Sequence, residues 1–186
     1  MTSAPRTVIF DLDGTLVDSD AALQAPFTYL GIAEADMPPL GLPLGAACDR
    51  AGVTVASYLG LYDGEAAAPF PGVDEMLGRL ERWGLCSNKL RHSGEQELAR
   101  FRWHPTVALF SDDFDGRPKA LDPVLVALEL ASADALFVGD TDHDRACAEL
   151  AQVDFALAGW NPRARRHARL EDTILDCPAD VLSLLD

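Results

Sequence analysis

The sequence TVIFDLDGT, residues 7–15, holds the strongest structural signal in this chain. Its apolar run, residues 8–10, is followed by a turn at Gly14, and this pattern predicts a buried strand with an abrupt end. Asp11 and Asp13 stand at the carboxyl end of that strand. Ligands bind at this edge of an open α/β sheet. The two carboxylates are therefore expected to lie in a binding site.

The overall composition indicates a globular protein. The 186 residues are enough for one medium-sized domain with a small inserted lobe, and a hydrophobic content of 48% argues against disorder. No apolar stretch approaches the roughly 20 residues that cross a bilayer. The first ten residues also lack the long apolar core of a secretory signal. We therefore expect no membrane association and a cytoplasmic location.

The formal net charge of −15 limits the partners of the chain. Such a charge repels the phosphate backbone of DNA and RNA, so no nucleic-acid partner is expected. A small phosphorylated substrate would need a local positive site that overcomes this field. A bound divalent cation is the strongest such device.

The remaining sequence alternates between short apolar segments and helical patterns. This alternation is typical of βαβ units and predicts an α/β fold with a Rossmann-like, mostly parallel sheet flanked by helices. Strands are expected at residues 7–10, 84–86, 107–110, 136–138 and 155–157, and helices at residues 73–82, 94–102, 122–130, 142–150 and 180–185.

One segment does not fit the alternation. Residues 20–69 contain no convincing strand, but they hold two helical runs separated by a turn-rich piece. We expect them to form a small helical lobe inserted directly after the first strand. The core would then comprise residues 1–19 and 70–186.

More polar groups follow other predicted strands. Ser87 and Asn88 come after the second strand, and Lys119 precedes the helix at residues 122–130. Asp140 and Asp144 follow the fourth strand, in the sequence GDTDHD. Because the carboxyl ends of parallel strands share one edge, these groups are expected to meet Asp11 and Asp13 there.

This set of side chains suits phosphoryl transfer. The reaction needs a nucleophile, an acid/base and fixed donors for the phosphate oxygens. Asp11 can attack phosphorus and form an aspartyl-phosphate, while Asp13 protonates the leaving oxygen and later activates water. Ser87 can donate to phosphate oxygens, and Lys119 can pair with both the phosphate and Asp11.

The same edge offers oxygen ligands for a metal. Carboxylate oxygens of Asp11 and Asp140, with the Asp13 carbonyl, suit octahedral Mg²⁺ that keeps some of its waters. Asp144 would orient Lys119 or a water on the metal. Mg²⁺ is therefore the expected cofactor.

Each piece also has an ordinary structural interpretation. A Ser-Asn step after a strand is usually a turn, Asp142 can cap the following helix, and Lys119 alone would be a surface lysine. Asp142 is therefore left out of the site, but the joint occurrence of the other groups in this order favours function. The cysteines show no metal-binding spacing, so reduced and mostly buried thiols are expected at Cys48, Cys86, Cys147 and Cys177.

Together these motifs resemble those of the haloacid dehalogenase superfamily, and in particular its phosphoglycolate phosphatase-like group. The similarity spans nearly the whole chain. It rests on DLDGTLVDSD (11–20), Pro71-Gly72-Val73, Ser87-Asn88-Lys89, Lys119 and GDTDHD (139–144).

The resemblance implies a Rossmann-like core, a helical cap inserted after the first motif, and magnesium-dependent hydrolysis of phosphate monoesters. It makes Asp11 the nucleophile and Asp13 the acid/base. Because true dehalogenases of the superfamily lack a carboxylate at the position of Asp13, that residue favours a phosphatase or a phosphomutase. The implied phosphate-binding residues are Gly14, Thr15, Ser87, Asn88 and Lys119, and the implied metal site comprises Asp11, Asp13, Asp140 and Asp144.

Three departures from the family pattern stand out. The third motif reads Arg117-Pro118-Lys119 where the family usually has Lys-Pro, so Arg117 is an alternative to the favoured Lys119. The strand before Ser87 is short, and the inserted lobe is small for a cap of this group. A small cap would admit larger substrates or rely on a partner subunit.

The leading functional hypothesis is a magnesium-dependent phosphatase that acts on a small phosphorylated metabolite, such as a phosphoglycolate-like compound or a sugar phosphate. A phosphomutase of the same fold is the nearest alternative. A non-catalytic module that binds phosphate or metal is another, and a phospho-receiver domain fits less well because Asp11 and Asp13 share one strand. Either a monomer or a homodimer is compatible with the sequence.

Overall fold

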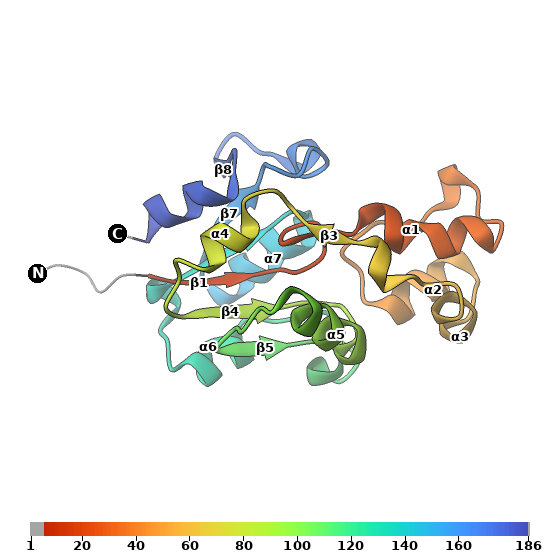
Figure 1. Cartoon of the computed structure of the whole chain (residues 1–186), viewed down its shortest axis with the longest axis horizontal. Coiled ribbons are helices and arrows are strands. Elements are labelled where there is room, and N and C mark those ends of the chain that lie inside the picture. The colour runs from red at the N-terminus through yellow and green to blue at the C-terminus, as the bar shows by residue number, and fades with distance from the viewer. Residues whose placement is uncertain (1–5, 186) are drawn as a thin grey trace, which may run out of the picture.

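The computed structural model describes residues 6–185, and a parallel six-stranded sheet forms its centre (Figure 1). The strand order is β5-β4-β1-β6-β7-β8. Residues 1–5, which belong to the expected core segment and to the amino terminus discussed above, lie outside the described residues, as does Asp186. The strands are β1 (Thr7–Phe10), β4 (Trp83–Cys86), β5 (Val107–Leu109), β6 (Ala135–Gly139), β7 (Asp154–Ala158) and β8 (Thr173–Leu175).

The expected α/β class with a Rossmann-like, mostly parallel sheet is confirmed. All five expected strands are present, and the second of them, β4, which was expected to be short, has the same four-residue length as β1. The sixth strand, β8, was not predicted from the sequence. Thr173 and Ile174 in this edge strand are exposed, so the segment lacks the apolar run that marked the other strands.

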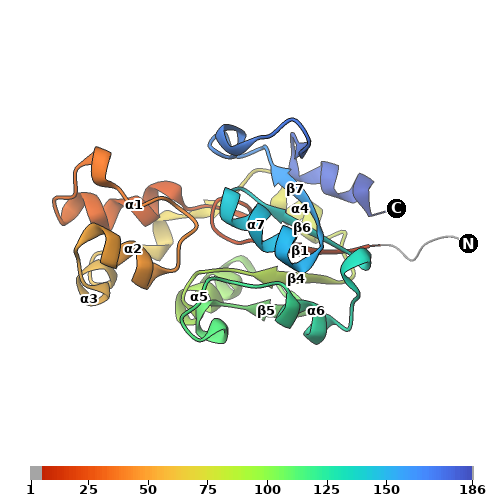
Figure 2. The same cartoon turned by 180° about the vertical axis from the view of Figure 1, so that it is seen from behind.

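Helices cover both faces of the sheet. The helices α4 and α5 lie on one face (Figure 1), and α6 and α7 lie on the other (Figure 2). Side chains along β1 alternate between the faces: Val8 and Phe10 join an apolar cluster with α4 and α5, whereas Ile9 joins another with α6 and α7. Burial on both faces explains why β1 reads as a continuous apolar run. The helices are α4 (Val73–Leu77), α5 (Arg91–Phe101), α6 (Asp122–Leu128) and α7 (Asp142–Ala151).

Two helical expectations were wrong in detail. The helix expected over residues 73–82 ends at Leu77, where Gly78 forms its C-cap. The short helix expected at residues 180–185 is instead a 3-10 helix over Pro178–Leu184, and it contacts α4.

The helices α1 (Asp20–Tyr29), α2 (Leu44–Ala51) and α3 (Val55–Leu59) lie together at one end of the molecule, beyond the sheet (Figure 1). We call residues 20–66 the helical lobe. A small apolar cluster of its own, which includes Phe27, Cys48 and Tyr58, holds the lobe together.

The stem of the lobe corrects the expectation that residues 20–69 hold no strand. The two-residue strand β3 (Ala68–Pro69) pairs antiparallel with β2 (Val17–Asp18). Strands this short carry no periodicity that a sequence pattern could reveal. The division of the chain into a core and a separate cap domain stays a prediction.

Two further expectations can be compared with the described residues. Within residues 6–185, no helix is both long enough and apolar enough to cross a membrane. The four thiols are unpaired, and all except that of Cys177 are buried.

Candidate active site

The carboxyl ends of β4, β1 and β6 bring the predicted site residues together. From β1 the chain runs outward through β4 and β5, and then returns to the other side of β1 to form β6. Such a reversal of strand order opens a crevice where ligands bind. Asp11 follows β1, and its backbone N–H donates to the carbonyl of Val138 in β6 (2.9 Å). Asp140 follows β6, so both carboxylates lie at this reversal.

Three buried carboxylates form a cluster at this point. Ligand-type oxygens of Asp11, Asp140 and Asp144 lie within 4.8 Å of one another. Asp13, whose carbonyl was the predicted metal ligand, has its carboxylate outside this cluster and directed to Lys89. An acidic group of this density, with hard oxygen donors, suits a divalent cation such as Mg²⁺.

The start of α7 fixes Asp144. Thr141 is the N-cap residue, and the Oδ2 atom of Asp144 accepts from the Thr141 backbone N–H (2.8 Å) and hydroxyl (2.6 Å). Thr141 and Asp144, the third residue of the helix, thereby form a capping box. Asp142, which was left out of the predicted site, is half-exposed and pairs with Arg145 and His167.

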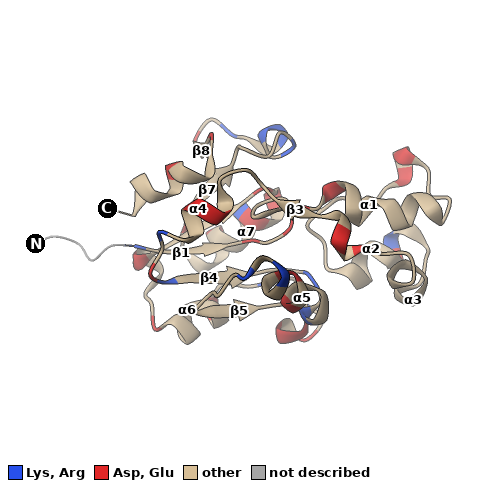
Figure 3. Cartoon of the chain, in the orientation of Figure 1, with Lys and Arg blue, Asp and Glu red and all other residues tan. Residues whose placement is uncertain are grey.

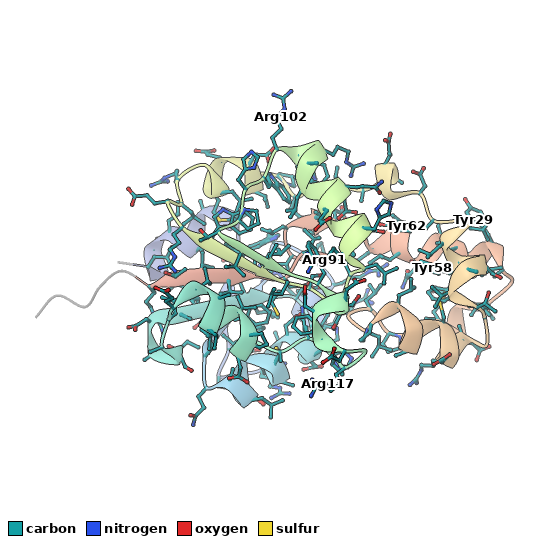
Figure 4. All side chains as sticks on the ribbon, turned by 90° about the horizontal axis from the view of Figure 1, so that it is seen from below. Tyr29, Tyr58, Tyr62, Arg91, Arg102 and Arg117 are labelled. Atoms are coloured by element: carbon teal, nitrogen blue, oxygen red, sulfur yellow. The ribbon has the colours of Figure 1, made fainter. Side chains whose placement is uncertain are left out.

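Lys119 is the cation of the cluster. Its Nζ atom lies 2.5 Å from Oδ1 of Asp11 and 2.6 Å from Oδ1 of Asp144, and its side chain is 4% exposed. Arg117, the alternative in the third motif, is 77% exposed and faces Asp115 on the surface (Figure 4). The structure therefore brings Lys119, and not Arg117, to the predicted nucleophile.

Asn88 links the cluster to the helical lobe. Its Oδ1 atom accepts from the backbone N–H of Lys119 (2.8 Å), and its Nδ2 atom donates to the carbonyl of Gly41 in the lobe (2.7 Å). Ser87 is buried, and its hydroxyl accepts from the backbone N–H of Lys89 (3.2 Å). Ser87 and Asn88, two of the residues predicted to bind phosphate, thus lie at the site. Asn88 also holds the backbone of Lys119 in position.

Gly14 and Thr15 lie against Asp140. Gly14 has a φ of +80°, and a Cβ atom there would lie 2.3 Å from the Asp140 carboxylate, so only glycine fits. The Thr15 hydroxyl donates to Asp140 Oδ1 (3.3 Å). Asn161, which the sequence analysis missed, donates to the Gly14 carbonyl (2.8 Å) and lies 3.4 Å from Asp140 Oδ2. Its position in the loop after β7 is the signal that could have indicated it.

A second ionic group surrounds Asp13, and the sequence analysis did not assign it. The Nζ atom of Lys89 lies 2.8 Å from Asp13 Oδ1, 3.0 Å from Glu97 Oε1 and 3.0 Å from the hydroxyl of Tyr62. Lys89 comes from the loop after β4 and Glu97 from α5. Tyr62 comes from the lobe (Figure 4). Because Lys89 directly follows Ser87-Asn88, its place beside that motif was the available signal.

Burial controls the charges of the acidic cluster, which lies inside an already acidic molecule (Figure 3). Burial raises the pKa of Asp11 to about 7, against the lowering effect of Lys119. Burial and the neighbouring Asp144 raise the pKa of Asp140 well above its usual range. Burial also opposes ionisation of Asp144, but Lys119 and Thr141 outweigh it and lower that pKa. One ammonium group therefore leaves the cluster short of positive charge, which fits a divalent cation.

Glu97 yields a pH-dependent prediction. Burial, with the nearby charge of Asp13, raises its pKa from 4.5 to about 7. A raised carboxyl pKa means that the folded state binds the proton more tightly, so stability falls as pH rises from about 4.5 towards 7. Glu97→Gln, measured by urea unfolding, should match the wild type near pH 4 and exceed it near pH 8 by about 3 kcal/mol. The exposed Glu95 on the same helix is the matched control, and Glu95→Gln should change the free energy of unfolding by less than about 1 kcal/mol. A pH-independent difference for Glu97→Gln would contradict the raised pKa.

A cavity of about 90 Å³ lies between this edge of the sheet and the lobe. Asp11, Asp13, Ser87 and Lys119 line its core side, and apolar lobe side chains line the opposite side. The predicted nucleophile and acid/base therefore face the same small space.

Comparisons with known proteins agree with this geometry. The family model for haloacid dehalogenase-like hydrolases matches residues 50–158. A phosphoglycolate phosphatase from Xanthomonas campestris is 30% identical, and the match covers 96% of this chain and 91% of that protein. A pyrophosphatase from Oceanobacillus iheyensis is 24% identical over 97% of this chain and 96% of its own length.

Solved structures show the same fold. A haloacid dehalogenase-like family hydrolase from Streptococcus pneumoniae superposes with a TM-score of 0.77 at 22% identity, over 98% of this chain and 99% of that one. The expected class of enzyme, a phosphatase, is confirmed by these comparisons. The chain belongs to the haloacid dehalogenase-like hydrolase family.

Proposed function

We propose that this phosphatase hydrolyses small phosphate monoesters through an aspartyl-phosphate on Asp11, with Mg²⁺ as its cofactor. The observation that carries the proposal is the cluster of Asp11, Asp140 and Asp144, buried around the single ammonium group of Lys119 beside a small cavity. The metal would be held by Asp11, Asp140 and the Asp13 carbonyl, with Asp144 behind them. Bound there, Mg²⁺ would neutralise charge on the phosphate oxygens and keep Asp11 ionised.

In the first step, a carboxylate oxygen of Asp11 attacks phosphorus and the bond to the ester oxygen breaks. Asp13, which faces the same cavity, gives its proton to the departing alcohol. Lys119 pairs with Asp11 and a phosphate oxygen, and the Ser87 hydroxyl donates to another. Asp13 then removes a proton from water, which attacks the phosphorus of the aspartyl-phosphate. Inorganic phosphate and the free Asp11 carboxylate result.

We also infer that residues 20–69 act as a cap over this site. The lobe lines the cavity, and Asn88 of the core bonds to Gly41 of the lobe. Water excluded from the cavity would strengthen the electrostatic contacts around the phosphate.

Metal removal tests the proposal. The protein should release phosphate from p-nitrophenyl phosphate with Mg²⁺, lose that activity in EDTA, and regain it when Mg²⁺ is restored. Mg²⁺ at about 100 times its Kd should also stabilise the fold by about 2.7 kcal/mol, visible as a higher melting temperature. Asp140→Asn removes one of the proposed metal ligands, so this variant should show weaker activation by Mg²⁺ and weaker stabilisation by Mg²⁺. Phosphate release that persists unchanged in EDTA would refute the metal-dependent mechanism.

A further inference from the structure

The lobe side of the cavity carries no charge among the described residues. Every lobe residue that lines the cavity is uncharged, and most are apolar, as Phe27, Leu42 and Leu44 illustrate. The hydroxyl of Tyr58 is already engaged, because it donates to the carbonyl of Leu23 (2.9 Å). A leaving group that enters this part of the cavity therefore meets mostly hydrocarbon surface, with the neutral amide of Gln24, whose Oε1 atom accepts from Arg163 (3.3 Å), as a polar exception.

The two lysines that line the cavity have no capacity for a second anion. An ammonium group has three donors. Those of Lys89 are directed to Asp13, Glu97 and Tyr62. Lys119 is held by two carboxylates and, on the proposed mechanism, serves the phosphate that is transferred.

The rest of the lobe does not supply the missing cation. Its one basic residue, Arg50, is exposed and does not line the cavity. Acidic residues outnumber it along the lobe (Figure 3). The Gly41 carbonyl, which faces Asn88, is a further acceptor on this side. A carboxylate or second phosphate on the substrate would remain unpaired here, at a large energetic cost.

We infer that the preferred substrate is a phosphate monoester whose alcohol is small, uncharged and partly apolar, and that esters with a second anionic group are discriminated against. This inference rests on the proposed function, because it concerns the leaving group of that reaction. The inferred preference differs from the substrates that the names of the relatives state, because both phosphoglycolate and pyrophosphate carry a second anionic group.

A matched pair of substrates tests the inference directly. Carbamoylmethyl phosphate is the neutral amide counterpart of 2-phosphoglycolate and has nearly the same shape. With Mg²⁺ at pH 7.5, the wild-type kcat/KM should be at least about tenfold higher for the amide than for 2-phosphoglycolate. Propyl phosphate should also be hydrolysed better than pyrophosphate.

A cation placed in the lobe should reverse the preference. In Leu42→Lys the half-buried site lets a long side chain extend into the cavity, so kcat/KM for 2-phosphoglycolate relative to the amide should rise about tenfold. Leu42→Met is the neutral control. Tyr29→Lys adds the same charge at a position that is 72% exposed and outside the cavity (Figure 4), and neither control should change the ratio.

Three outcomes would overturn the inference. Wild-type hydrolysis of 2-phosphoglycolate as efficient as that of the amide would do so without any variant. An equal gain in Tyr29→Lys and Leu42→Lys would show that the lobe's general charge, and not the cavity lining, sets the preference. No phosphate release from any ester, p-nitrophenyl phosphate included, would instead refute the proposed function and this inference with it.

Discussion

Replacing Asp11 with asparagine is expected to lower kcat for phosphate release by at least about 1000-fold and to leave the fold intact. The neutral amide cannot attack phosphorus as a carboxylate does, so no aspartyl-phosphate forms. The folded state should tolerate the change because asparagine has nearly the same size. Burial raises the Asp11 pKa to about 7, so the wild-type carboxylate is itself unfavourable there without a metal. In EDTA, the melting temperature of Asp11→Asn should therefore equal or exceed that of the wild type.

Asp142→Asn provides the matched control for this prediction. This variant makes the same Asp-to-Asn substitution close to the cluster. The Asp142 carboxylate, however, is 54% exposed and pairs with Arg145 and His167. Its activity should stay within about twofold of the wild type. Turnover at the wild-type rate in Asp11→Asn would reject Asp11 as the nucleophile. A loss of stability in EDTA would show that the Asp11 carboxylate contributes favourably to the metal-free fold.

The sequence was sufficient to predict a mostly parallel sheet and five of its six strands. Each strand that is buried on both faces, such as β1 and β6, appears as an apolar run that a polar step ends abruptly. Once those strands are parallel, their carboxyl ends must share an edge, and Asp11 and Asp140 meet there because β1 and β6 are neighbours in the sheet. The edge strand β8 was missed because its side chains are mostly exposed and carry no such pattern.

Contacts that depend on packing between distant elements could not be predicted in the same way. Lys89 meets Glu97 and Tyr62 only because α5 and the lobe converge on the loop after β4. The third motif left Arg117 open as an alternative, since both are cations beside Pro118, and the favoured Lys119 is the residue that reaches Asp11. The bond that the Asn88 side chain accepts from the Lys119 backbone had no signal in the sequence. Such contacts follow from tertiary structure and leave no periodic signal.

Of the substitutions proposed for this protein, Lys119→Met should cause the largest loss of stability. Methionine has a similar length, so the change mainly removes the charge that lies between Asp11 and Asp144. Loss of one partner from a buried ionic group leaves uncompensated charge, which typically costs about 3–5 kcal/mol. The free energy of unfolding in EDTA, measured with urea, should fall by about that amount. Phosphate release should also be lost, because no ammonium group then pairs with both Asp11 and an oxygen of the transferred phosphate.

The pH and metal dependence of this loss identifies its cause. If uncompensated carboxylates are responsible, protonating them relieves the penalty. The deficit of Lys119→Met relative to the wild type should therefore shrink as pH falls from 8 towards 5, through the raised pKa of Asp11. Added Mg²⁺ should likewise recover part of the stability but not the activity. Arg117→Met, which removes a cation that is 77% exposed, should change the free energy of unfolding by less than about 0.5 kcal/mol. A deficit that neither acid nor Mg²⁺ reduces would mean that Lys119 acts through packing, and the cluster would then not need a cation to fold.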